Sequence, residues 1–103
     1  MLTRYASSTD SFEWDSEKEA ANRKKHGISF ADAIAVFEDE RAILVFDDAH
    51  SEAEDRFRII GRLRGQLIAL VVFTDRGAHT RIISARLANK HEVQLYEGRS
   101  FPH

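Results

Sequence analysis

The 103-residue sequence contains no cysteine, one proline and no long hydrophobic run, and each scarcity excludes a class of protein. Without cysteine there can be no disulfide framework, no thiolate zinc site and no thiol nucleophile. The longest apolar run, LIALVVF at 67–73, is far shorter than the ~18 residues that a membrane-spanning helix needs. The first eleven residues, MLTRYASSTDS, lack the apolar stretch of a targeting segment. We therefore expect a soluble cytoplasmic protein that does not contact a membrane.

The length and composition suit one compact domain. A chain of this size with 43% hydrophobic residues can bury roughly 60 to 65% of its surface on folding. It contains no internal repeat or low-complexity segment. We predict a flexible N-terminal segment over 1–11, a single domain over 12–97 and a C-terminal tail over 98–103.

The formal net charge of -2 conceals an asymmetry along the chain. Residues 1–55 contain 6 Lys and Arg against 14 Asp and Glu, a balance of -8, whereas residues 56–103 contain 9 against 3, a balance of +6. Separate acidic and basic surfaces would let the protein meet an anionic polymer on one side and a basic partner on the other. The alternative is that folding interleaves the two signs.

The hydrophobic pattern predicts an α+β fold. Two helices are expected near 16–26 and 30–38, the first capped by Asp15 and ended by Gly27. Four extended stretches follow at 42–48, 56–64, 66–73 and 80–86, and the run at 66–73 is apolar enough to be a central strand. A last helix is expected over 89–97, with Glu92 closing a cap on Asn89. The prediction is two N-terminal helices, a four-stranded mainly antiparallel sheet and a C-terminal helix, while SFEW at 11–14 could be a short edge strand.

The stretch RFRIIGRLRG at 56–65 alternates in an unusual way. In a strand, successive side chains point to opposite faces, so Phe57, Ile59, Gly61 and Leu63 share the core face. The opposite face then carries a row of arginines uninterrupted by an acidic residue. Such a row suggests an anionic ligand. Its members are Arg56, Arg58, Arg62 and Arg64.

Four blocks of the sequence resemble the BrnT family of toxins. They are WDSEKEAANRKKHGISF at 14–30, HSEAEDRF at 50–57, IIGR at 59–62 and RIISARLANKHEVQLYE at 81–97. Their order and spacing, with the ISAR-x-A block near the end, extend the resemblance over about residues 12–97. The resemblance implies a RelE-like fold and a metal-independent endoribonuclease that inhibits translation and needs no cofactor. It also implies neutralisation by a BrnA-like antitoxin, a ribbon-helix-helix protein through which the toxin would meet DNA only indirectly.

The chemistry of metal-free RNA cleavage agrees with this resemblance. The 2'-hydroxyl attacks the phosphodiester, so the enzyme must take a proton, stabilise a dianionic phosphorane and protonate the leaving 5'-oxygen. Arginine suits the second task because its planar fork binds two phosphate oxygens and stays charged. The candidates for phosphate contact in catalysis are Arg62 and Arg86, from the IGR and SAR blocks, and Arg56. For proton transfer the candidates by residue type are His26, Tyr96, Lys25, Glu54 and Glu92.

Each of these residues has a structural alternative. His26 would stabilise the helix dipole in the last turn of its helix, Glu92 would be a cap, and Tyr96 would be a core aromatic with its hydroxyl at the surface. By strict alternation Arg81 and Arg86 face opposite sides unless a bulge intervenes, and we favour Arg86 for the site. The remaining candidates for RNA binding, each with a solvated position as its alternative, are Lys25, Arg58, Arg64 and Arg81.

The segment DDAHSE at 47–52 brings carboxylates and a histidine together but does not predict a metal site. It has no glycine to make the turn that oxygen-rich sites need, so a solvated loop is expected. A glycine-rich phosphate loop and a GxSxG elbow are also missing. The rival to a ribonuclease is therefore a non-catalytic module that binds RNA or protein.

Overall fold

The computed structural model of the chain describes residues 11–46 and 56–98. Apart from Ser11 and Gly98, the predicted N-terminal segment (1–11) and tail (98–103) lie outside these residues. The elements in chain order are β1 (Phe12–Glu13), α1 (Ser16–His26), α2 (Phe30–Phe37), β2 (Ile43–Phe46), β3 (Phe57–Arg64), β4 (Leu67–Arg76), β5 (His79–Leu87) and α3 (Lys90–Gly98).

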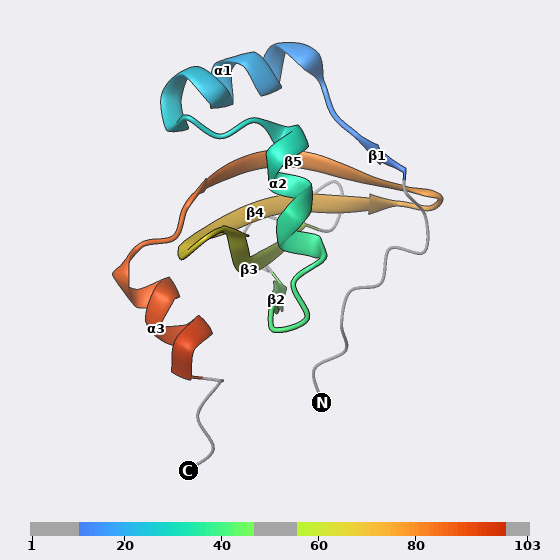
Figure 1. The fold of residues 1–103 in the computed structure, drawn as a ribbon. Helices are drawn as coiled ribbons and strands as arrows, with labels where there is room; N and C mark the ends of the chain where they lie inside the picture. Colours follow the sequence, from blue (N-terminus) through green and yellow to red (C-terminus); the bar gives the residue numbers. More distant parts are fainter. Residues whose placement is uncertain (1–10, 47–55, 99–103) are drawn as a thin grey trace.

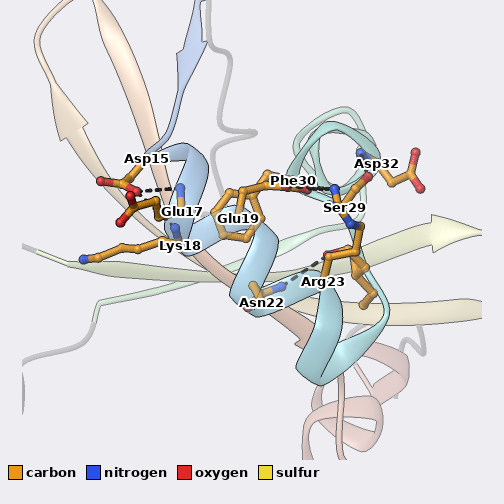
Figure 2. Close-up of polar contacts among 10 residues, drawn as sticks. Asp15, Glu17, Lys18, Glu19, Asn22, Arg23, Ser29, Phe30 and Asp32 are labelled. Atoms are coloured by element: carbon orange, nitrogen blue, oxygen red, sulfur yellow. Dashed lines mark hydrogen bonds and ion pairs between the residues drawn. The ribbon is translucent and has the colours of Figure 1, made fainter.

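The predicted helix signals are confirmed. The Asp15 carboxylate accepts hydrogen bonds from the backbone N–H groups of Glu17 (2.8 Å) and Lys18 (3.0 Å), which begins α1 (Figure 2). Gly27 ends α1 in the left-handed conformation, with φ 78°, that glycine adopts without steric cost. The Ser29 hydroxyl accepts from the N–H of Asp32 (3.0 Å) and begins α2. Local hydrogen bonds therefore fix where both helices start.

Within the described residues the sheet has five strands, in the order β1-β5-β4-β3-β2. Strands β2 to β5 pair antiparallel, and β4 is central as predicted. The prediction of four strands is short by one, because β1 pairs parallel with β5 and makes the sheet mixed. SFEW therefore supplies the edge strand that its aromatic residues suggested.

Two β-bulges change which side chains share a face. In the β3–β4 pair, Arg62 faces Ile68 and Arg64 faces Leu67, so Leu63 is the extra residue. In the β4–β5 pair, Val72 faces Ser84 and Phe73 faces Ile82, so the register again shifts by one. Each bulge reverses the alternation on the bulged strand beyond it.

One sheet face is covered by α2, with α1 along β5, and we call it the α2 face (Figure 1). Its core includes Phe30 and Val36 from α2 and Ile59, Val71 and Phe73 from the sheet, all almost fully buried. Aromatic rings run through this layer: Phe37 lies 5.0 Å from both Phe12 and Phe73 between ring centroids. Leu63 is also buried, so the predicted core face of the arginine strand is confirmed.

The opposite side, which we call the α3 face, has a smaller core. Ile60, Leu70 and Tyr96 are buried there, with Ile43, Ile68 and Val72 packed against them. Ile60 belongs to the arginine side of β3 by alternation, yet it is only 2% exposed. This side of β3 therefore carries arginines and also an apolar residue, Ile60, that packs against α3.

Candidate nucleic-acid interface

The α3 face brings together four of the residues proposed from the sequence. Arg58 and Arg62 lie on β3 opposite Val72 and Ile68, and Arg86 lies on β5 opposite Leu70. Tyr96 packs onto the same face from α3. Arg62 is exposed, and its guanidinium forms no ion pair within residues 11–46 and 56–98. It is the side chain of this group best placed to receive an anion.

Glu92 holds Arg86 by a two-pronged ion pair. The Nη1 and Nη2 atoms of Arg86 donate to Oε1 and Oε2 of Glu92, each over 2.9 Å. Glu92 also accepts from the N–H of Asn89 (2.9 Å), whose side chain accepts from the N–H of Glu92 (2.8 Å). The predicted cap is confirmed, and the same carboxylate occupies the fork of Arg86. The hydrogen bond from Arg86 outweighs burial and lowers the pKa of Glu92 below its ordinary value.

Asp39, which follows α2, joins Tyr96 to the strand of Arg62. Its Oδ2 accepts from the Tyr96 hydroxyl (2.7 Å) and from the N–H of Arg62 (2.8 Å), and its Oδ1 accepts from the N–H of Arg41 (3.0 Å). Burial alone would raise the pKa of Asp39, but these hydrogen bonds lower it. Burial and the bond to Asp39 raise the pKa of Tyr96, which is 5% exposed. The structure thus places Tyr96 in the core with its hydroxyl satisfied by Asp39.

Arg64 does not lie on the same sheet face as Arg58 and Arg62. Because of the bulge at Leu63, its side chain turns to the α2 face and lies 3.6 Å from Asp32 in an exposed ion pair. Strict alternation placed Arg62 and Arg64 together, and that expectation is wrong. Arg64 instead lines a shallow pocket beside α2, together with residues that include Ile34, Glu38 and Leu63.

Arg81 and Arg86 share a side of the sheet, because the bulge that strict alternation left open is present. They face Thr74 and Leu70, residues of the same parity on β4. They still do not meet, since Arg81 lies toward the other end of β5 and pairs with Glu13 at 2.9 Å. This pair and Arg64–Asp32 join the basic half of the chain to the acidic half, so folding interleaves the two signs at these positions.

The other proposed residues lie apart from this group. Arg56 is half-exposed and directly precedes β3. Lys25 and His26 are exposed in the last turn of α1, which packs against β5. The predicted loop DDAHSE and Glu54 lie outside the described residues. Within the described part of the chain, no three His, Asp or Glu side chains gather to hold a metal ion.

Asn22 fixes the position of α1. Its amide donates to the carbonyls of Ala85 (2.8 Å) and Ile28 (3.2 Å), and its Oδ1 accepts from the N–H of Ala85 (3.1 Å). Glu19 links α1 to α2, because its carboxylate accepts from the N–H of Phe30 (3.3 Å) (Figure 2). Within α1 the same carboxylate pairs with Arg23 (2.9 Å). The basic turn that contains Lys25 and His26 is therefore attached to the residue before Arg86.

Sequence reasoning missed both Asp39 and Asn22. Asp39 stands in the acidic run EDER at 38–41, next to the expected end of the second helix. Its partners Arg62 and Tyr96 are distant in the chain, so no local signal identifies it. For Asn22 the one available signal was its place on the same helical face as Trp14, the side that meets the sheet.

Comparison with known proteins defines the class of this protein as a toxin of a type II toxin-antitoxin system. A family model described as "Ribonuclease toxin, BrnT, of type II toxin-antitoxin system" matches residues 14–92, well over half of the chain. The chain belongs to the BrnT family, which confirms the resemblance seen in its sequence blocks.

A solved structure supports the same assignment. The chain is similar to the ribonuclease toxin BrnT of Brucella abortus, known from a 1.1 Å crystal structure, with 31% identity and a TM-score of 0.63. The match covers 80% of this chain and 100% of the other. A search of curated protein sequences finds no match. Within the described residues, no helix is long and apolar enough to cross a membrane.

Proposed function

We propose that this protein is a metal-independent endoribonuclease that cleaves RNA and thereby inhibits translation. The observation that carries the proposal is Arg62, an exposed arginine whose backbone is fixed by Asp39. Membership of a family named for ribonuclease toxins supports the choice of RNA as the anion.

In this proposal Arg62 contacts the scissile phosphate and stabilises the charge that develops on the phosphorane. A guanidinium held by a fixed backbone suits this task because little reorganisation is needed as the charge appears. Arg58, on the same side of β3, and Arg56 at its start would contact neighbouring phosphates. Arg86 contributes positive charge at the edge of the site while its guanidinium group is ion-paired with Glu92.

The proton transfers are assigned by exclusion among the described candidates. Glu92 is engaged by Arg86 and Asn89, and the Tyr96 hydroxyl donates a hydrogen bond to Asp39. His26 is exposed and of the type that exchanges protons near neutral pH. His26 is therefore the described candidate that we propose for proton transfer, with Lys25 beside it as a phosphate contact. Both lie apart from Arg62, on the helix that Asn22 joins to Ala85, so the proposal requires RNA to extend past Arg86 toward the last turn of α1.

The proposal includes the partner. The type II toxin-antitoxin family implies an antitoxin, and we propose a BrnA-like protein with a ribbon-helix-helix region that binds DNA. We also propose that the α+β fold is of the RelE-like kind. Cytoplasmic RNA would be the substrate.

The test compares Arg62→Ala with Arg64→Ala in RNA cleavage by purified protein, with and without EDTA. The two arginines are both exposed and lie two positions apart on β3, but they are on opposite sheet faces, which makes Arg64 a matched control. We expect Arg62→Ala to lose roughly 10²- to 10³-fold in rate, by analogy with oxyanion donors, and Arg64→Ala to stay close to the parent. EDTA should leave cleavage unchanged.

Growth arrest on expression should follow the same order. Equal loss in both variants would contradict a specific phosphate contact by Arg62. Binding of RNA without cleavage by the parent protein would instead support the non-catalytic binding module. Loss of cleavage in EDTA would contradict metal independence alone.

A further inference from the structure

We infer that Asp39 is the positioning residue of the candidate RNA-binding surface on the α3 face. Its carboxylate fixes the backbone of Arg62 on β3 and holds α3 through the hydroxyl of Tyr96. This inference rests on the proposed function only for its effect on RNA cleavage. The contacts themselves are independent of any substrate.

The first observation is where Asp39 lies in the sheet. Strand β2 pairs with β3 from Phe46↔Phe57 to Ile43↔Ile60 and no further. In the part of the chain that the structure describes, the next residues of β3 therefore have no strand partner on that side. The Asp39 carboxylate accepts from the N–H of Arg62 at this position, so it substitutes for the missing strand and fixes the backbone that presents the guanidinium.

The second observation is that one oxygen serves two elements. Oδ2 of Asp39 accepts from Arg62 on β3 and from the hydroxyl of Tyr96 on α3. Because both donors converge on the same atom, a shift of α3 at Tyr96 moves the acceptor of Arg62 as well. Because the core under α3 is small, this bond and the Arg86–Glu92 ion pair both contribute to holding the helix.

The third observation is the residue that makes room for the carboxylate. A Cβ added at Gly61 would lie 3.2 Å from Oδ2 of Asp39, 3.0 Å from Val36 Cγ1 and 3.1 Å from Ala42 Cβ. Any side chain at position 61 would push against these three groups. The strand thus has a glycine beside Arg62 where the carboxylate approaches its edge.

The experiment uses Asp39→Ala and Asp39→Asn in the full chain, with Glu38→Ala as the matched control. Glu38 is an exposed neighbour of the same charge type. All proteins carry Tyr5→Phe, which leaves Tyr96 as the single tyrosine. Three quantities are measured below the unfolding temperature of every variant: kcat and KM for RNA cleavage, the pKa of Tyr96 by tyrosinate absorbance, and hydrogen exchange of the Arg62 amide.

Asp39→Ala should lower kcat by about 10²-fold, because a misplaced catalytic group typically costs this much, and should change KM much less. It should also lower the pKa of Tyr96, which the charged groups Asp39, Arg62 and Arg41 influence, and accelerate exchange of the Arg62 amide. Asp39→Asn should recover most of kcat, since an amide oxygen can still accept from both donors, while still lowering the pKa of Tyr96. Glu38→Ala should resemble the parent in all three.

Equal kcat in Asp39→Ala and Glu38→Ala would overturn the inference for catalysis. An unchanged Tyr96 titration and unchanged Arg62 exchange in Asp39→Ala would overturn the coupling itself. If the parent protein cleaves no RNA, the proposed function fails, and the titration and exchange data still decide whether Asp39 holds the two elements. A loss of kcat that Asp39→Asn does not recover would show that charge matters and position does not.

Discussion

The two faces of the sheet are held by different forces. Among the residues that the structure describes, the cluster on the α2 face contains thirteen buried hydrophobic residues, whereas the cluster on the α3 face contains three, one of which is Tyr96. The α3 face is held in addition by directed polar contacts, Arg86 to Glu92 and Tyr96 to Asp39. Apolar packing stabilises the fold but is not directional, whereas hydrogen bonds and ion pairs fix the positions of charged side chains. The comparison assigns stability mainly to one face and the candidate site to the other.

The largest expected effect lies on the α2 face. Phe73→Ala removes a fully buried ring that stacks on Phe57 at 5.4 Å and meets Phe37. Its free energy of unfolding should fall by about 3 to 5 kcal/mol because a cavity remains. Leu67→Ala on the same strand is the control, since Leu67 is 43% exposed. Urea denaturation measures both, and similar midpoints would refute the packing assigned to this face.

A smaller effect is expected from the polar contacts of α3. Glu92→Ala removes the partner of Arg86 and the cap of the helix, so the free energy of unfolding should fall by about 1.5 to 3 kcal/mol. Glu97→Ala, an exposed position on the same helix, should change it little. Chemical denaturation of the two variants checks this order. A cost for Glu92→Ala no greater than for Glu97→Ala would show that the ion pair does not hold α3.

Gly61→Ala lies where the two faces meet and should cost about 1 to 3 kcal/mol, the usual range for overpacking. The added methyl group would press on Val36, Ala42 and the carboxylate of Asp39. Because Asp39 also binds Tyr96, the pKa of Tyr96 should change in this variant, whereas Gly98→Ala, where a Cβ meets nothing within 4 Å, should leave it unchanged. Thermal unfolding and tyrosinate titration together test this. If Gly61→Ala kept the unfolding temperature of the parent while the pKa of Tyr96 changed, the added methyl group would act on Asp39 and not on the packing of Val36 and Ala42.

The smallest effect is on the pH dependence of stability. The folded-state pKa of Glu92 lies below the ordinary value of 4.5, so its contribution is present above about pH 4.5 and is lost as the pH falls through the folded pKa. Asp39 acts in the same direction from an ordinary value of 3.8. In Glu92→Gln the free energy of unfolding should therefore fall less steeply than in the parent as the pH is lowered from about 6 to 3. If the free energy of unfolding of Glu92→Gln fell as steeply as that of the parent, Glu92 would not contribute to the loss of stability in acid.

The sequence predicted the helices, the central strand and the core face of β3 because these depend on local capping and on alternation. It did not predict the bulges at Leu63 and beside Val72. A bulge inserts one residue without a distinctive local pattern, and its position depends on the partner strand. The error about Arg64 follows directly from this.

The candidate site was predicted only in part for a related reason. Arg62, Arg86 and Tyr96 stand in sequence blocks that resemble the family, so they could be selected before the structure. Their partners could not be identified equally well: Glu92 lies six residues from Arg86 and was recognised as a cap, while Asp39 is 57 residues from Tyr96. Contacts over such distances depend on topology, which the alternation of residue types does not encode.

The pairing of Asn22 with Ala85 has a consequence for how the protein behaves at high concentration. Strand β1 pairs with β5 at Thr80 and Arg81, and within residues 11–46 and 56–98 no strand pairs with β5 farther along on that side. Unpaired edge groups offer a template on which another chain can add a strand and begin to aggregate. The Asn22 amide engages both the N–H and the carbonyl of Ala85, so an incoming strand would first have to expel α1. One buried side chain thus protects the solubility of the sheet at this edge.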